Sequence, residues 1–198
     1  QNHLNNFMYV ENNRSMAEFE GYSPYEMQQI IHNTFDEKSP VTLKKLKKED
    51  YKLIPIFNQL KYLAGIISRS GELKLTRKGF LPVRVVSELY SQGFMQEYYI
   101  EKGFLKLYKE MDSIGVHIAH ILLKISGLAK KRNNKLSLTK KGEKISGDDS
   151  QLFRLILETY VKKFNWAHLD YYGSRNIGQL GFGFSLIMLH KYGNKKRI

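Results

Sequence analysis

The chain has 198 residues, contains no cysteine and carries a formal net charge of +13 at neutral pH. The lack of cysteine excludes disulfides, thiolate zinc sites and cysteine nucleophiles, and it fits a cytoplasmic protein. No apolar run approaches the ~20 residues of a membrane span. The surplus of cations favours polyanions such as nucleic acid, although a solvated basic surface without any partner has the same composition.

The first predicted elements are an arm and two helices. Residues 1–20 are rich in asparagine and predict an extended or poorly ordered arm. Ser23-Pro24-Tyr25-Glu26 then places a capping side chain, a proline and a glutamate where a helix begins. With the apolar spacing that follows, it predicts a helix over 24–34. The same spacing predicts a helix over roughly 51–64, with Pro55 near its first turn.

Two β-hairpins are predicted in the middle of the chain. The first covers 66–76, where apolar and charged side chains alternate around a Ser70-Gly71 turn. The second, more basic hairpin covers 128–139, with its turn at Arg132-Asn133-Asn134. Further helices are predicted over about 81–91, 104–111, 113–127, 150–163 and 184–191.

A repeated motif connects the two hairpins. Leu73-Lys-Leu-Thr-Arg-Lys-Gly79 matches Leu136-Ser-Leu-Thr-Lys-Lys-Gly142 without a gap. In each copy we expect the two leucines to share the strand face that packs on the preceding helix. We expect Thr76 and Thr139 to bond to backbone at the strand end, and Gly79 and Gly142 to adopt positive φ.

This pattern predicts a mainly α protein with short β-hairpins, built from tandem winged-helix-like modules. In such modules a helix enters the major groove of DNA and a basic hairpin, the wing, lies against the flanking backbone. The expected division is an arm over 1–20, a first module over 21–92, a second module over 93–147, and a helical, aromatic segment over 148–198 packed on both.

The motifs also resemble those of a known family. Leu73-Lys-Leu-Thr-Arg-Lys-Gly-Phe-Leu-Pro82 and Leu138-Thr-Lys-Lys-Gly142, with Gly-Tyr-Ser-Pro-Tyr-Glu-Met27 upstream, are similar to a family of uncharacterised bacterial proteins. Its relatives occur on plasmids and mobile elements, and some carry a small Cys/His metal-binding motif that this chain lacks. The resemblance covers roughly 20–190 and implies a bacterial origin and the fold above. It implies no catalytic residues.

The predicted nucleic-acid interface consists of the two hairpins and the helix before the second. Cations there would neutralise phosphates and release counterions, while asparagines can bond to phosphate or base edges. The candidate residues are Arg69, Lys74, Arg77, Lys78, His117, His120, Lys124, Lys130, Lys131, Arg132, Asn133, Asn134 and Lys135. A solvated charged hairpin, protected by lysine against edge pairing, is the alternative for both clusters.

The favoured function is binding of duplex DNA by a bacterial cytoplasmic protein. His117-x-x-His120 lacks further ligands at metal spacing, so we expect no metal and no cofactor. The first alternative is an interaction module for a protein partner, such as an acidic one, which an exposed apolar patch over 164–172 would favour. The second is an enzyme of unrecognised type, which a pocket holding His168 and Asp170 would favour. An enzyme is the less expected outcome.

Overall fold

The computed structural model describes residues 2–167 and 181–194, which belong to two compact units. The terminal unit combines Gln1–Lys44 with Asn165–Ile198, and the central unit is Lys45–Phe164. This division differs from the predicted one. The expected boundary after residue 92 lies inside the central unit, because helices and strands from both sides of it pack on each other there.

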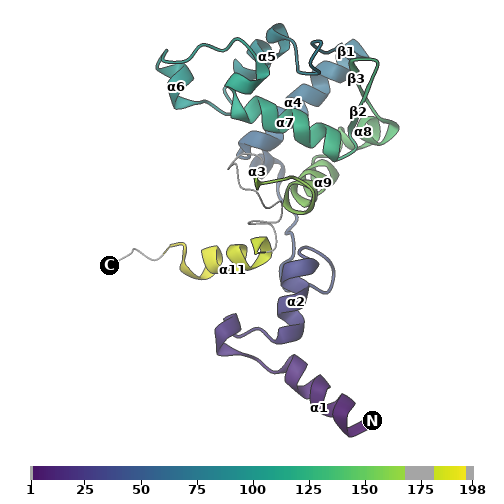
Figure 1. Cartoon of the computed structure of the whole chain (residues 1–198), viewed down its shortest axis with the longest axis vertical. Coiled ribbons are helices and arrows are strands. Elements are labelled where there is room, and N and C mark those ends of the chain that lie inside the picture. Colours follow the sequence, from purple (N-terminus) through teal and green to yellow (C-terminus); the bar gives the residue numbers. More distant parts are fainter. Residues whose placement is uncertain (1, 168–180, 195–198) are drawn as a thin grey trace. The chain divides into compact units, whose positions relative to one another are not determined.

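The terminal unit consists of helices. They are α1 (Asn2–Asn13), the 3-10 helix η1 (Ala17–Phe19), α2 (Pro24–His32) and α11 (Phe182–Tyr192) (Figure 1). The predicted arm is wrong for residues 2–13, which are helical. The predicted capping box of α2 is confirmed, because Ser23 and Glu26 bond to each other's backbone N–H. α11 packs on α2, and Trp166 and Phe182 meet edge to face at 5.4 Å.

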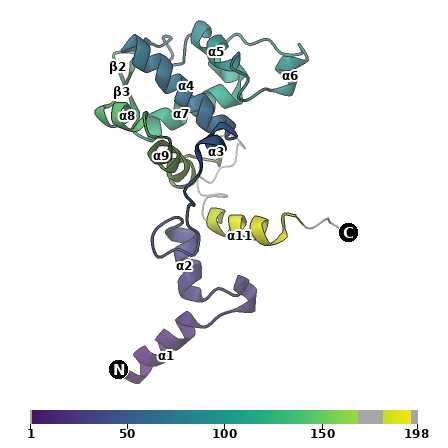
Figure 2. The same cartoon turned by 180° about the vertical axis from the view of Figure 1, so that it is seen from behind.

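The central unit contains the sheet and most of the core. Its elements are α3 (Lys48–Lys52), α4 (Pro55–Ser70), β1 (Leu73–Lys74), α5 (Val83–Tyr90), α6 (Tyr98–Glu101), η2 (Glu110–Asp112), α7 (Ile114–Ile125), β2 (Ala129–Arg132), β3 (Lys135–Leu138), α8 (Lys140–Ile145) and α9 (Asp149–Lys162). α4 and α7 pack along each other, and α9 packs on α7 (Figures 1 and 2). The protein is therefore mainly helical, with one small sheet.

That sheet is antiparallel and has the strand order β1-β3-β2. Leu73 and Leu136, which occupy matching positions in the two copies of the motif, lie directly opposite each other. Both are buried, as are Leu75 and Leu138, and β3 packs against α4. The predicted apolar strand face is confirmed, and the two copies contribute to one sheet.

The first predicted hairpin is wrong. Residues 66–70 continue α4, which ends only at Gly71 with φ 69°. The remaining strand, β1, then pairs with β3 of the second copy. A run such as Ile66-Ile67-Ser68-Arg69 fits a helix as well as a strand, and a helix without a breaker propagates at little cost.

The connection between α5 and α7 also differs from the prediction. In place of a helix over 104–111, the chain forms α6, turns at Gly103 with φ 73°, and resumes only at η2. The carboxylate of Asp112 accepts bonds from the backbone N–H groups of Tyr108 and Lys109, which fixes that second start. None of the helices in the described residues has the length and apolarity to cross a membrane.

The two threonines of the motif act as predicted, whereas one of its glycines does not. Thr76 Oγ1 accepts from the Phe80 N–H at 3.1 Å, and Thr139 Oγ1 accepts from the Gly142 N–H at 3.0 Å. Gly79 has φ 86°, as expected. Gly142 instead lies within α8, so the prediction of positive φ is wrong there. Its lack of a side chain is needed because a Cβ would overlap the carbonyl oxygen of Leu128.

Candidate nucleic-acid interface

The second hairpin, β2–β3, turns through two residues. Asn133 and Asn134 have φ of 48° and 58°, the left-handed pair that a tight hairpin requires. The Asn134 side-chain amide donates to the carbonyl oxygens of Leu75 at 3.0 Å and Thr76 at 2.8 Å. Asn134 therefore ties the hairpin to the chain after β1. Asn133 is exposed.

We expect these two asparagines to respond differently to substitution. Asn134→Gly loses two hydrogen bonds and should lower the free energy of unfolding by about 1–2 kcal/mol. Asn133→Gly should leave it unchanged or raise it by a few tenths of a kcal/mol, since glycine adopts positive φ without strain. Urea denaturation of both variants measures the difference. Equal effects would contradict the structural role given to the Asn134 amide.

A row of three cations crosses the outer face of the sheet. Lys74 on β1 lies opposite Lys135 on β3, which lies opposite Arg132 on β2. All three are exposed, and Lys130 shares their face on β2. Like charges placed directly opposite each other destabilise a sheet. Only Lys135 of this row has an ion pair in the described part of the chain, to Glu72.

The inner edge of the hairpin holds two more cations. Lys131 is exposed and lies opposite Leu136. Its ammonium group lies against Gly79, where a Cβ would overlap it. Burial lowers the pKa of the half-buried Lys124 on α7; the charge of Glu110 opposes this effect and that of Lys131 adds to it. Lys124 and Lys131 thus repel each other at a place where a bound anion would relieve the repulsion.

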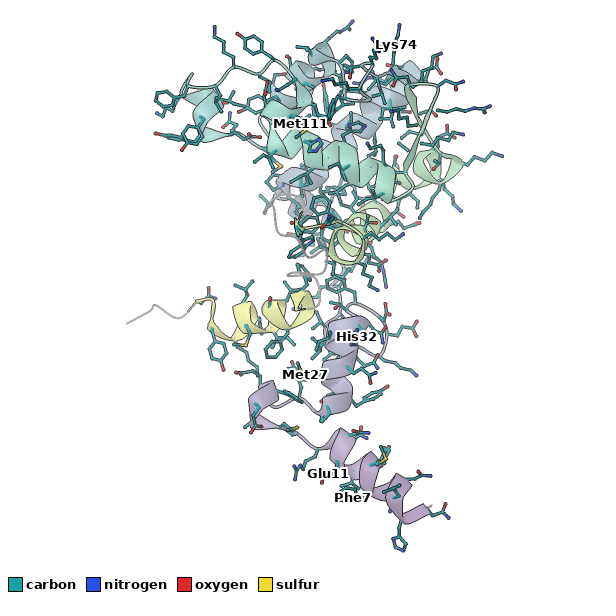
Figure 3. All side chains as sticks on the ribbon, viewed as in Figure 1. Phe7, Glu11, Met27, His32, Lys74 and Met111 are labelled. Atoms are coloured by element: carbon teal, nitrogen blue, oxygen red, sulfur yellow. The ribbon has the colours of Figure 1, made fainter. Side chains whose placement is uncertain are left out.

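A groove continues from the turn after β1. It has a volume of about 400 Å³, and its cations are Arg77 and Lys78 from the turn and Lys109 before η2. Phe80 and Met111 contribute apolar walls, and Figure 3 labels Met111 in the central unit. The groove brings together basic residues from two separate loops, of which the sequence had indicated only Arg77 and Lys78.

A buried carboxylate supports this groove from below. Glu110 is 1% exposed, and its oxygens lie 2.7 Å from Nδ1 of His117 and 2.9 Å from Nδ1 of His120. The Leu81 backbone N–H donates to the same carboxylate at 2.6 Å. Glu110 therefore joins η2, α7 and the wall of the groove at one point.

The pKa of Glu110 reflects two opposing effects. Burial alone raises it, but hydrogen bonds from His117 and His120, the charge of His120 and the Leu81 amide together lower it to about 2. Neither imidazole is available to a nucleic acid, and the prediction of His117 and His120 as contacts is wrong for that reason. Among the residues that the structure describes, no group of His, Asp and Glu side chains is arranged to hold a metal ion.

The remaining predicted residues have separate places. Arg69, at the end of α4, lies 3.7 Å from Glu88 and stacks over the ring of Tyr62, so it is engaged with its own fold. Glu110 was missed because a single glutamate in a polar stretch looks solvated. Two histidines on an otherwise apolar helix were the signal for a buried acidic partner.

The enzyme and interaction alternatives depend on the C-terminal aromatic segment. His168, Asp170 and most of 164–172 lie outside the described residues. Of the described part, Phe164 and Ala167 are 2% and 5% exposed. The exposed apolar patch expected there therefore does not include these two residues.

The fold and this surface define a mainly helical protein whose small antiparallel sheet presents cations on its outer face. The model of one family, the Y4jL N-terminal domain, matches residues 52–152, just over half of the chain. The chain therefore belongs to the Y4jL N-terminal domain family. The match extends from the end of α3 into α9 and includes the sheet, the groove and Glu110. An uncharacterised family agrees with the resemblance in the motifs. No curated protein and no solved structure gives a significant match.

Proposed function

We propose that the central unit binds duplex DNA through its β2–β3 hairpin, which acts as the wing of a single winged-helix-like module. The observation that carries this proposal is the row Lys74–Lys135–Arg132 on the outer face of the sheet. Three opposed cations cost stability in the free protein, and a polyanion would remove that cost.

The order of the elements supports one module in place of two. α4, β1, α5, α7 and the β2–β3 hairpin follow one another, with β1 beside β3 at the edge of the hairpin sheet. A helix, a strand, two helices and a hairpin in this order form the arrangement of a winged helix. The long connection between α5 and α7 is an addition to it.

The contacts expected from this geometry are made mainly with the DNA backbone. α7 would be the recognition helix, but its two histidines are buried and Lys124 is its remaining polar position near the hairpin. Lysine and arginine on a hairpin bind phosphates and carry little sequence information. We therefore propose weak sequence preference, a revision of the modest preference first expected from this helix. A bacterial, cytoplasmic protein associated with mobile elements stays a prediction.

The test compares two triple variants that lose the same charge. Lys130→Ala/Lys131→Ala/Arg132→Ala removes the wing cations, and Lys44→Ala/Lys48→Ala/Lys52→Ala removes three exposed lysines in and before α3. On a random-sequence duplex at low salt, we expect the wing variant to bind at least about tenfold more weakly than wild type. The control should bind within about twofold of wild type. Equal losses would mean that only net charge matters, and undetectable wild-type binding would remove the proposal.

The interaction alternative has one specific observation in its favour. α1 has no buried residue, and its exposed apolar side chains are Leu4, Phe7, Met8, Tyr9 and Val10. A patch of this kind is typical of a contact with another protein. If the wing variant binds DNA as well as wild type does, α1 becomes the surface to examine for a protein partner.

A further inference from the structure

The connection between α5 and α7 exposes an unusual set of aromatic rings. Tyr98 and Tyr99 on α6 are 65% and 61% exposed, Phe104 is 70% exposed and Tyr108 is 65% exposed. Tyr99 lies 5.5 Å from Tyr98 and 6.5 Å from Phe104, between ring centroids, so three of the rings form one cluster. We name residues 98–109 the aromatic segment. Rings that contribute to a core are covered, and these are not.

The acidic side chains around this segment serve the fold. Glu97 accepts from the Ser113 hydroxyl at 2.7 Å and from the Gly115 N–H at 3.3 Å, at the start of α7. Glu101 accepts from the Tyr90 hydroxyl at 2.9 Å. Asp112 caps η2 and Glu110 is buried with its histidines. Each carboxylate thus has a partner within the protein.

The lysines of the segment lie at the surface. Lys102, Lys106 and Lys109 are all exposed, and the ammonium group of Lys102 lies 6.0 Å from the centroid of the Tyr98 ring. Lys109 also lines the basic groove with Arg77 and Lys78. Exposed rings interleaved with cations match the chemistry of an unpaired nucleic-acid strand, whose bases stack on rings while its phosphates meet lysines. A protein partner would meet the rings but would not need the lysines.

We infer that the aromatic segment binds unpaired bases, so that the preferred ligand is a duplex with a single-stranded tail. This inference rests on the proposed function of the hairpin. In both views α6 and the β2–β3 hairpin lie at different ends of the central unit (Figures 1 and 2). The basic groove contains residues from the turn after β1 and from the end of the aromatic segment. It therefore offers the tail a cationic path between them.

The experiment measures binding to a blunt random-sequence duplex, to the same duplex with a thymidine tail, and to the tail alone. The variant Tyr98→Ala/Phe104→Ala removes two rings. Phe7→Ala/Tyr9→Ala on α1 is a matched control, because it removes one phenylalanine and one tyrosine that are 64% and 69% exposed. Tyr98→Phe/Phe104→Tyr keeps both rings and distinguishes stacking from the hydroxyl group.

We expect wild type to prefer the tailed duplex over the blunt one. The Tyr98→Ala/Phe104→Ala variant should bind the tailed duplex roughly tenfold to a hundredfold more weakly, as expected for two lost stacking contacts, and the blunt duplex unchanged. The α1 control and the ring-preserving variant should behave as wild type. All variants should keep the wild-type thermal transition, since the replaced rings are exposed.

Two other results would overturn the inference in distinguishable ways. Equal affinity of wild type for blunt and tailed duplexes, or an undiminished preference in the Tyr98→Ala/Phe104→Ala variant, would remove it and leave the role of the wing intact. Binding of the tail alone, lost with the rings while blunt duplex does not bind at all, would keep the aromatic segment and remove the wing. If no form binds, both proposals fail.

Discussion

Glu110→Ala should lower the free energy of unfolding by about 3–5 kcal/mol, because it leaves two buried imidazoles and the Leu81 N–H without their shared acceptor. Total stabilities are commonly about 5–15 kcal/mol, so this single change would unfold a substantial fraction of the protein at moderate temperature. Urea denaturation measures the loss. Glu101→Ala is a suitable control, since it removes an exposed carboxylate bonded to one tyrosine. It should cost less than about 1 kcal/mol.

The same carboxylate predicts a dependence on pH. The pKa of Glu110 is about 2 in the folded protein and ordinarily 4.5, so the folded state holds the ionised form more strongly. Its contribution is therefore present above pH 4.5 and disappears as the pH falls toward 2. At about 1.4 kcal/mol per unit this amounts to roughly 3 kcal/mol. Glu110→Gln should flatten the loss of stability over this window. An unchanged acid transition in that variant would contradict the structural role of Glu110.

The second large effect is expected at Gly142. Gly142→Ala should lower the free energy of unfolding by about 2–3 kcal/mol, because the new Cβ would overlap the Leu128 carbonyl and push α8 away from the start of β2. Gly147 offers a matched control, since a Cβ there meets nothing within 4 Å. Gly147→Ala should change the stability by less than about 0.5 kcal/mol. Similar thermal shifts for both variants would mean that α8 does not approach Leu128 closely.

The local signals in the sequence predicted local structure well. The capping box of Ser23 and Glu26, the threonine bonds of the motif and the second hairpin all depend on residues within a few positions of one another. Such signals act through short-range hydrogen bonds and backbone preferences, which a sequence displays directly.

The long-range pairing could not be read in the same way. β1 pairs with a strand from the second copy of the motif, and nothing near Leu73 specifies that partner. The repeat was visible, but it fits two separate hairpins as well as one shared sheet. The cation row across the sheet follows only from this pairing, so the sequence indicated its members without their alignment.

The buried cluster was hidden for a related reason. His117 and His120 were interpreted as exposed polar positions because polar residues on helices usually face water. Their true environment depends on Glu110, which precedes α7 and reaches it only through the fold of η2. The same is true of Lys109, whose place in the groove depends on that turn.

The most direct test of the central claim is the salt dependence of binding to a random-sequence duplex. A plot of log affinity against log salt should be steep for wild type, with a slope of roughly −0.9 for each contacted phosphate. The variant Lys130→Ala/Lys131→Ala/Arg132→Ala should lose roughly two to three units of that slope. If wild type and variant have equal slopes, the β2–β3 hairpin does not contact the DNA backbone, and the account of a wing is contradicted.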